Sequence, residues 1–131
     1  MTAPVLTITL ARGEKRNAQS SVMLRELNAA FDLAILDPAV KVIILAGDDP
    51  DFSAGHDMKE ADPVRSGPGC PPISTWGDWD QPGFQDRYTR EQEIYLQSTR
   101  RWRNISKPTI AQVQGNCAAG GLMLAWCCDL I

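Results

Sequence analysis

The N-terminal part of the chain alternates between a strand pattern and a helix pattern. In residues 5–10 threonine alternates with apolar residues, which predicts a half-buried strand. Over residues 23–35 apolar residues recur at the spacing of one helical face. Ser20 or Ser21 precedes this run and is suited to accept a hydrogen bond at the helix start. The pattern therefore predicts a strand followed by an amphipathic helix.

A second strand follows this helix. The residue before proline is disfavoured in the α conformation, so the helix should end at Asp37 and Pro38. Residues 40–46 form a nearly continuous apolar run, which is typical of a strand covered on both faces in a parallel sheet. Residues 109–113 predict the next strand, and residues 121–128 predict the next helix. Alternating strands and helices indicate an α/β fold with right-handed crossovers.

The chain changes character after Glu60. Nine of the 21 residues in the range 63–83 are proline or glycine, so neither helix nor strand should persist there. We interpret residues 61–83 as a Pro/Gly-rich inserted loop. Trp76 and Trp79 offer it enough apolar area to close over a site as a lid, or to pack on a neighbouring subunit.

An amphipathic helix is predicted over residues 84–105, where Tyr88, Tyr95 and Trp102 lie close to helical spacing. Three arginines crowd its last turns: Arg100, Arg101 and Arg103. Two interpretations of these arginines stay open. They complement the negative end of the helix dipole, or they form a phosphate-binding patch.

The composition narrows the class of protein. The 131 residues are 44% hydrophobic and 22% charged, with a formal net charge of -3, as in an ordinary soluble domain. This balance gives no basic surface for nucleic acid, and no apolar run approaches the roughly 18 residues of a membrane span. The N-terminus does not follow the pattern of a secretory leader, so we expect a cytoplasmic protein. The four cysteines include no C-x-x-C pair and predict buried thiols rather than a metal site.

Two segments with glycine follow predicted strands and are the candidates for chemistry. Residues 52–60 follow the strand at 40–46, and residues 114–125 carry Gly120 and Gly121 where a strand gives way to a helix. Glycine lets the backbone approach a ligand closely, and free N-H groups at a helix start attract an anionic oxygen. Two N-H groups that converge on one oxygen form an oxyanion hole, which stabilises the charge that develops in acyl chemistry.

These segments resemble, in order, those of the crotonase superfamily of enoyl-CoA hydratases and isomerases. The matching segments are residues 12–18, 42–47, 52–60 and 107–111, the last leading into 115–121. Four motifs in family order are more specific than any one alone. The resemblance implies the α/β crotonase (ClpP/crotonase-like) fold with repeated ββα units. Members of the superfamily are longer, so residues 1–131 are expected to be the N-terminal part of a single crotonase-like domain.

The resemblance also implies an acyl-CoA thioester substrate whose carbonyl oxygen is held by two backbone N-H groups. By motif position these N-H groups belong to His56 and Gly120. The expected substrate-binding residues are Ala54, Gly55, His56, Asp57, Met58, Lys59 and Gly120. Of these, residues 57–59 should border the adenine end of coenzyme A. The family further implies coenzyme A as part of the substrate, no tightly bound cofactor, no metal, and a homo-oligomer, either a trimer or a hexamer.

Two side chains in the first segment need a separate interpretation. His56 is the only histidine, and an imidazole could act as a base. Its backbone N-H already accounts for the position, however, so we expect the side chain not to be catalytic. For Asp57 we expect a structural role, in which the carboxylate ties down the loop by local hydrogen bonds.

One position departs from the family pattern. Hydratases resembling this chain have a glutamate three residues after the oxyanion-hole glycine, where this chain has Met123, and a thioether cannot transfer a proton. Three hypotheses stay open: a hydratase or isomerase that acts through a thioester enolate, a non-catalytic acyl-CoA-binding or structural subunit, and a half-chain that requires a complementary C-terminal half. We expect the 131-residue chain alone to be inactive.

Overall fold

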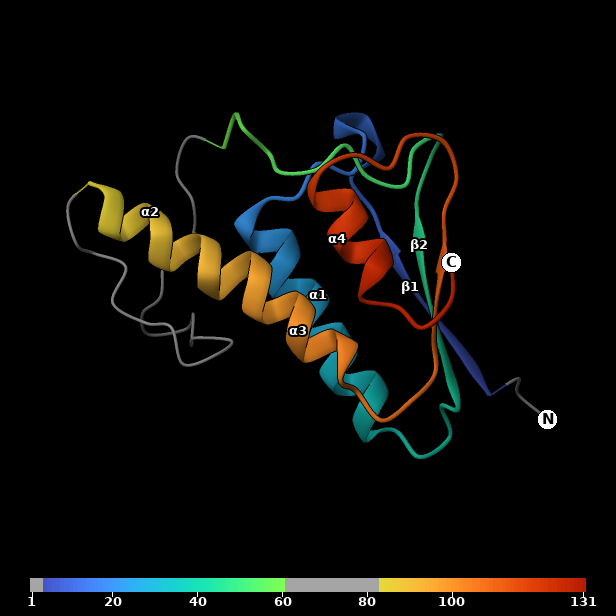
Figure 1. Cartoon of the computed structure of the whole chain (residues 1–131). Coiled ribbons are helices and arrows are strands. Elements are labelled where there is room, and N and C mark those ends of the chain that lie inside the picture. Colours follow the sequence, from blue (N-terminus) through green and yellow to red (C-terminus); the bar gives the residue numbers. More distant parts are fainter. Residues whose placement is uncertain (1–3, 61–82) are drawn as a thin grey trace.

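Three parallel strands lie beside a layer of helices in the computed structural model, which describes residues 4–60 and 83–131 (Figure 1). The strands are β1 (Val5–Leu10), β2 (Val42–Gly47) and β3 (Thr109–Gln112), in the order β1-β2-β3. Both pairs are parallel, with Val5 opposite Val42 and Ile43 opposite Thr109. Parallel neighbours need a crossover, and helices supply it here. The predicted α/β class and its three strands are confirmed.

Strand β1 is less buried than its pattern predicts. Val5 is 44% exposed and Leu6 is 36% exposed, whereas Leu10 is buried. The reason is that β1 pairs with β2 alone and lies at an edge of the described sheet. Strand β2 has neighbours on both sides, and its residues Ile43 and Leu45 are fully buried.

Helix α1 (Ser21–Leu36) begins and ends as predicted. The Ser20 side chain accepts a hydrogen bond from the Met23 N-H at 3.2 Å and so caps the helix start. The helix ends before Asp37, whose extended backbone leads into Pro38. Its buried face contributes Phe31, which stacks on Trp102 with ring centroids 5.5 Å apart. This aromatic pair joins α1 to α3 (Ser98–Arg103).

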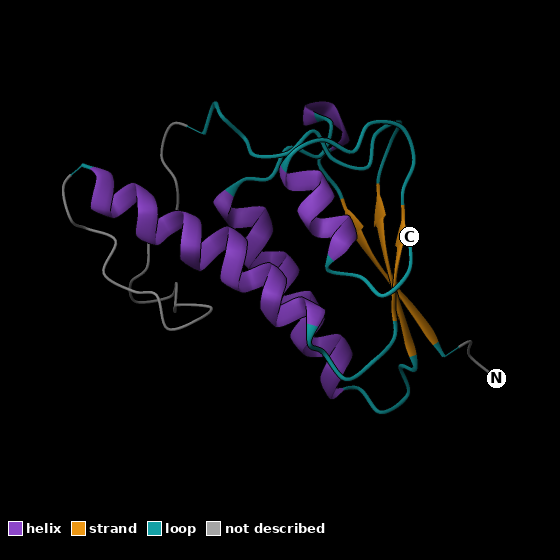
Figure 2. Cartoon of the chain, viewed as in Figure 1, coloured by secondary structure: helices purple, strands orange, loops and turns teal. Residues whose placement is uncertain are grey.

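The expected helix over residues 84–105 is present but is not uniform. Helix α2 (Phe84–Arg90) leads into a π-helix, η2 (Glu91–Gln97), and then into α3 (Ser98–Arg103). In Figure 2 the three run on as one rod beside α1. A π-helix has wider turns than an α-helix and is often found near functional sites. Helical spacing alone did not predict it.

Helix α4 (Gly120–Trp126) follows β3 and packs its buried residues Leu124 and Ala125 into the same core. After α4 the chain returns to the sheet, where Leu130 bridges Ile110 of β3. The chain therefore runs parallel to β3 at this point. Cys127 and Cys128 are buried, as expected for apolar thiols, and Cys117 is half-buried.

Some of the predictions from the sequence concern residues that the structure does not describe. The inserted loop lies almost wholly outside the described residues, as do its two tryptophans and Cys70. Within residues 4–60 and 83–131, no helix is long and apolar enough to cross a membrane. No group of three or more histidine, cysteine or acidic side chains in this part of the chain could hold a metal ion.

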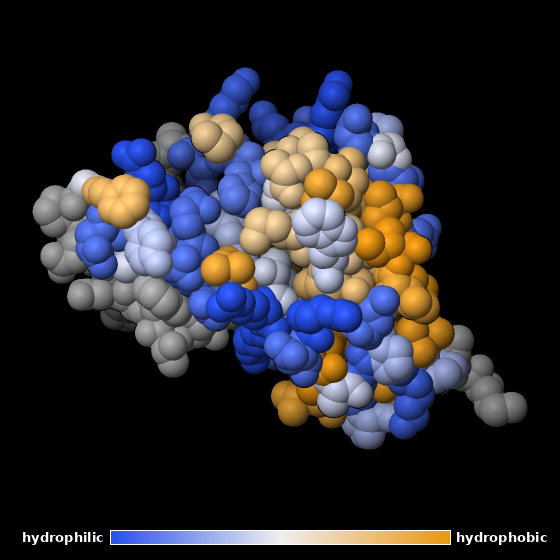
Figure 3. All heavy atoms as spheres, viewed as in Figure 1, coloured by the Kyte–Doolittle hydropathy of each residue, from blue (hydrophilic) through white to orange (hydrophobic). Residues whose placement is uncertain are grey.

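Hydrophobic residues also gather on the surface. Figure 3 shows them over α4 and the adjoining end of the chain. The exposed members of this surface are Leu122, Trp126, Leu130 and Ile131. Exposed patches of this kind favour association with other protein surfaces.

Candidate active site

The first half of the candidate site is the loop at residues 53–57. Ser53 bridges Cys117, and His56 bridges Gln19, so three loops at the strand ends are held side by side. The Gln19 N-H donates to the Gly55 carbonyl at 2.7 Å, and the Asp57 N-H donates to the Gln19 carbonyl at 2.9 Å. In a parallel bridge these two bonds flank the central residue. The N-H of His56 therefore points away from Gln19.

Gly55 brings this loop against the start of α4. Its φ is 95°, which favours glycine. A Cβ at this position would lie 2.9 Å from the Ala118 carbonyl oxygen and 3.3 Å from the Gly120 nitrogen. Both the conformation and the lack of space therefore require glycine, as the sequence pattern suggested.

The second half of the candidate site is the start of α4. The Gly121 N-H donates to the Ala118 carbonyl at 2.7 Å. By contrast, the N-H groups of Gly120 and His56 donate to no acceptor within residues 4–60 and 83–131. Two free donors on adjoining loops can hold one oxygen atom between them. The preceding residue, Ala119, has a φ of 46°, and such strain in a non-glycine residue is concentrated at functional sites.

The side chain of His56 lies in the same place. A Cβ on Gly120 would lie 2.5 Å from Cδ2 of His56 and 2.8 Å from its Nε2. The imidazole also stacks on Tyr95, with ring centroids 3.6 Å apart and 27° between the planes. Burial lowers the pKa of His56 below its ordinary value, and Glu91 acts in the opposite direction. Helical spacing predicted Tyr95 only as part of a helical face, and no signal in the sequence indicated this contact.

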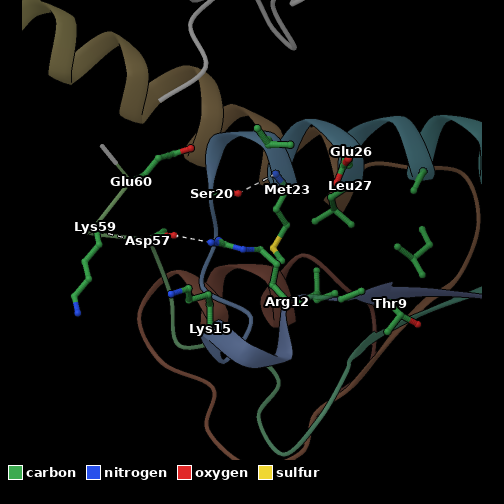
Figure 4. Close-up of a pocket in the computed structure, with 15 residues that line it drawn as sticks. Thr9, Arg12, Lys15, Ser20, Met23, Glu26, Leu27, Asp57, Lys59 and Glu60 are labelled. Atoms are coloured by element: carbon green, nitrogen blue, oxygen red, sulfur yellow. Dashed lines mark hydrogen bonds and ion pairs between the residues drawn. The ribbon is translucent and has the colours of Figure 1, made fainter. Parts of the chain in front are cut away.

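A cavity of about 670 Å³ opens on the other side of the loop, between β1 and α1 (Figure 4). Its charged lining consists of three cations and three carboxylates: Arg12, Lys15, Lys59, Glu26, Asp57 and Glu60. Arg12 donates to Oδ2 of Asp57 at 3.0 Å and to the Ala18 carbonyl at 2.7 Å. No ion pair holds Lys15 or Lys59 in the described part of the chain. The cavity therefore offers two uncommitted ammonium groups beside a paired guanidinium.

Asp57 has the structural contacts expected of it. Its Oδ1 accepts a hydrogen bond from the Lys59 N-H at 3.1 Å. That bond, followed by the one from Arg12, lowers the pKa of the carboxyl below its ordinary value. Asp57 thus remains ionised and holds the loop to Arg12. Arg12 lies in the matching segment 12–18, but its ion pair with Asp57 was not predicted.

The structure divides the expected substrate-binding residues between two places. Asp57 and Lys59 line the cavity, whereas Ala54, Gly55, His56 and Gly120 are not among its lining residues. Gly55, His56 and Gly120 belong to the neighbouring contact between the loops. The Ala54 N-H instead donates to the Arg16 carbonyl at 2.9 Å. Met58 is 90% exposed and also lies outside the cavity lining.

Two buried polar residues support the loops and were not predicted. Gln19 is 1% exposed, and its Nε2 donates to Oγ of Ser53 at 3.3 Å. Asp51 accepts hydrogen bonds from the backbone N-H and the side-chain amide of Asn116, at 2.8 and 2.7 Å. The first of these bonds is the main cause of a lowered pKa at Asp51. Gln19 and Asp51 lie just outside the matching segments, and their burial depends on loops that are distant in sequence.

The arginines at the end of the helical rod are mostly committed to protein partners. Arg101 pairs with Asp32 at 2.6 Å, and Arg103 pairs with Asp129 at 2.8 Å. No arginine from this cluster lines the cavity that holds Lys15 and Lys59. The alternative of a phosphate-binding patch therefore has no support at that cavity.

Met123 lies one turn into α4 and is half-buried. It borders a shallow groove of about 300 Å³ together with Leu96 and Trp126. The nearest following carboxylate in sequence, Asp129, accepts hydrogen bonds from the N-H and the hydroxyl of Thr109, at 2.9 and 3.1 Å. Asp129 is therefore held at the end of β3 and does not replace the missing glutamate.

Comparison with known proteins decides the family. A family model described as enoyl-CoA hydratase/isomerase matches residues 1–66 and 78–131. The chain belongs to the enoyl-CoA hydratase/isomerase family of the crotonase superfamily. The matched residues leave out 67–77, within the expected insertion.

Individual members of the family show how much of a full chain is present. EchA13 of Mycobacterium tuberculosis is 48% identical over 130 residues, which cover 97% of this chain and 41% of EchA13. The mitochondrial enoyl-CoA hydratase of Pongo abelii is 34% identical over 95% of this chain and 36% of its own length. The crystal structure of a probable enoyl-CoA hydratase from Mycobacterium smegmatis superimposes with a TM-score of 0.78 and 41% identity, over 99% of this chain and 46% of that one. The fold is therefore the crotonase fold, and this chain spans less than half the length of these relatives.

Proposed function

We propose that this protein binds an acyl-CoA thioester and stabilises its enolate in an oxyanion hole formed by the N-H groups of His56 and Gly120. One observation carries the proposal: both donors lack an acceptor within residues 4–60 and 83–131, and they lie on loops that Gly55 holds in contact. Membership of the enoyl-CoA hydratase/isomerase family supports it. The reaction class is a lyase or an isomerase.

The chemical advantage comes from charge that develops during the reaction. When a nucleophile adds to the β-carbon of an enoyl thioester, or a proton leaves the α-carbon, an electron pair moves onto the thioester oxygen. An anionic oxygen accepts stronger hydrogen bonds than a neutral carbonyl does. Fixed N-H donors therefore stabilise the enolate more than the substrate, and this difference lowers the barrier.

The cavity beside Lys15 and Lys59 is proposed to take the phosphate and adenine end of coenzyme A. Its polar end carries cations that the described residues leave unpaired, and the phosphates of coenzyme A are anionic. Asp57 connects this cavity to the oxyanion hole because it is adjacent to His56 in the same loop. A thioester could thus reach both places.

Removing either of these lysines should weaken the affinity for coenzyme A. We expect Lys59→Ala and Lys15→Ala each to raise Kd by about fivefold at low salt, with less effect at high salt, because exposed charge pairs are screened. Titration calorimetry with free coenzyme A measures this. Lys41→Ala is the matched control, because the Lys41 ammonium donates to the Pro38 carbonyl and does not line the cavity. An equal loss of affinity in the control would contradict this placement of coenzyme A.

The oxyanion hole itself is tested by a pair of ligands that differ in one oxygen. Butyryl-CoA has the thioester carbonyl, whereas its thioether analogue S-butyl-CoA lacks that oxygen. We expect the thioester to bind about tenfold more tightly, since two hydrogen bonds are gained. Equal affinities for the two ligands would rule out the oxyanion hole and leave only binding of the coenzyme.

Met123 favours a second candidate function, which is acyl-CoA binding without efficient chemistry. A thioether supplies no proton, and Asp129 is held by Thr109 and Arg103. We therefore expect the 131-residue chain to hydrate crotonyl-CoA poorly by itself, with the proton transfer left to water and a loss of roughly 10² to 10⁴ in rate. A hydration assay on the purified chain measures this. Brisk hydration by the monomeric chain would exclude the binding-only function and the requirement for a complementary half.

A further inference from the structure

The side chain of His56 occupies the space beside both proposed donors. It belongs to the residue that supplies one N-H group, and its Cδ2 would be 2.5 Å from a Cβ on Gly120, which supplies the other. The imidazole also stacks on the ring of Tyr95, with centroids 3.6 Å apart. Any movement of this ring therefore disturbs the contact between the two loops.

Nε2 of His56 is fully buried, and no hydrogen-bond partner for it lies among the described residues. A neutral imidazole needs a donor partner on only one nitrogen, but an imidazolium donates from both. An imidazolium in this position would therefore carry a buried N-H without an acceptor. Buried polar groups without partners are rare in native proteins, so the position of this nitrogen needs an explanation.

The groups that face the ring do not supply this acceptor. Glu91 of η2 acts on the imidazole from a distance and favours its charged form, yet burial has the larger effect. Gln19 and Gly120, the neighbours on the other two segments, have no ionisable group. Oε1 of Gln19 is a neutral acceptor nearby, but it makes no hydrogen bond to Nε2. The remaining charges beside the stacked tyrosine are Glu60, Arg90 and Asp57.

Tyr95 is a stable support for the ring. Burial, followed by Glu91, raises its pKa to about 12, so the phenol stays neutral over the range in which histidine titrates. The wide turns of the π-helix hold Tyr95 on the rod at this position. The imidazole is thus held between a fixed aromatic ring and a glycine backbone.

We propose that the neutral imidazole of His56 is a positioning residue, which fills the space between Tyr95 and Gly120, sets the separation of the two N-H donors, and leaves this space when Nε2 is protonated. The proposal rests on the proposed function, because it assigns the ring a role at the same oxyanion hole. It makes binding of the thioester dependent on pH, with the competent form at the higher pH.

The direction of this pH dependence follows from the linkage between proton binding and ligand binding. If acyl-CoA binds only when the ring is neutral, the bound ligand must lower the pKa of His56 further. In the free protein the imidazole should titrate below the ordinary value of about 6.5. Affinity should therefore fall as the pH is lowered through that range. A histidine with a merely structural role would titrate independently of the ligand.

His56 is the only histidine in the chain, so one imidazole signal in an NMR spectrum reports on it without ambiguity. We expect this signal to titrate at least one unit lower in the presence of saturating butyryl-CoA, which corresponds to a tenfold preference for the neutral form. The same pKa with and without ligand would overturn the proposal. No binding of butyryl-CoA at any pH would overturn the proposed function as well.

A variant without an imidazole distinguishes the titration of His56 from the titration of the ligand. His56→Phe keeps an aromatic ring that takes no proton, while the phosphate of coenzyme A titrates equally against both proteins. We expect Kd for butyryl-CoA to rise about tenfold more in the wild-type protein than in His56→Phe between pH 7.5 and roughly pH 5. Identical pH profiles would overturn the proposal while leaving the proposed function intact.

The support given by Tyr95 has a matched control on the same helical rod. Tyr95→Leu removes the ring that stacks on His56, whereas Tyr88→Leu removes one that stacks on Phe84. We expect Tyr95→Leu to raise the pKa of His56 toward its ordinary value and to weaken its response to ligand. Tyr88→Leu should leave both unchanged, and equal changes in the two variants would overturn the role of the stack.

Discussion

Gly120→Val is expected to lower turnover of an acyl-CoA by roughly 10²-fold or more, the loss seen when an oxyanion-hole donor is removed. A Cβ at this position would lie 2.5 Å from Cδ2 of His56 and 2.8 Å from Oε1 of Gln19. Either the imidazole or the glycine backbone must then move, and the N-H of residue 120 is displaced from the proposed oxygen position. Steady-state kinetics of the catalytically complete protein, with circular dichroism to verify folding, measures this loss.

The control for this prediction is His56→Ala, which keeps the backbone N-H of residue 56 and removes only the imidazole. We expect a smaller loss, of about tenfold, since the ring acts through position. The double variant Gly120→Ala/His56→Ala should be more active than Gly120→Ala, because the new methyl group no longer meets the ring. Equal losses from His56→Ala and Gly120→Val, with folding intact, would argue for catalysis by the side chain of His56.

Gly115→Ala is expected to lower the free energy of unfolding by about 3 kcal/mol or more, from strained backbone and overpacking together. Gly115 has a φ of 56° and lies against the loop that precedes the candidate site. A Cβ there would overlap the carbonyl oxygen of Pro50 and lie 2.7 Å from Oδ1 of Asp51. These atoms belong to backbone and to a buried carboxylate that binds Asn116, so they cannot easily yield. Urea denaturation measures the shift in midpoint.

Gly83→Ala is the matched control for Gly115→Ala. Gly83 also has a positive φ, of 76°, but no atom of residues 4–60 and 83–131 lies within 4 Å of a Cβ built on it. Only the conformational cost remains, so we expect a loss of about 1 kcal/mol. The difference between the two variants isolates the steric contribution. Equal midpoints would show that the loops around Pro50 rearrange without cost.

The sequence by itself determined the order and type of the elements. Threonine alternation at residues 5–10, the serine cap and the proline stop at residue 38 are local signals, and local sterics and capping act within a few residues. They correctly predicted β1 and both ends of α1. The glycines at residues 55 and 120 were also recognised, because glycine is selected by backbone conformation and close approach.

Burial and partners were decided only by the tertiary structure. Val5 and Leu6 are exposed because β1 lies at a sheet edge, and no pattern within the strand states which neighbours it will have. The π-helix at Glu91–Gln97 likewise differs from the uniform helix predicted from spacing. Hydrophobic periodicity reports which face is apolar and is insensitive to one wide turn.

In the candidate site, too, local signals and tertiary contacts account for different features. The two backbone donors could be assigned from motifs in their own loops, whereas the stack of His56 on Tyr95 joins residues 39 positions apart and is brought about by the folded helical rod. In the same way Arg12 meets Asp57, and Asp51 meets Asn116, only because three parallel strands deliver their following loops to one edge of the sheet. The sequence therefore indicated candidate residues for the chemistry, and the tertiary structure decided which of them meet, because long-range contacts depend on the packing of whole elements rather than on local spacing.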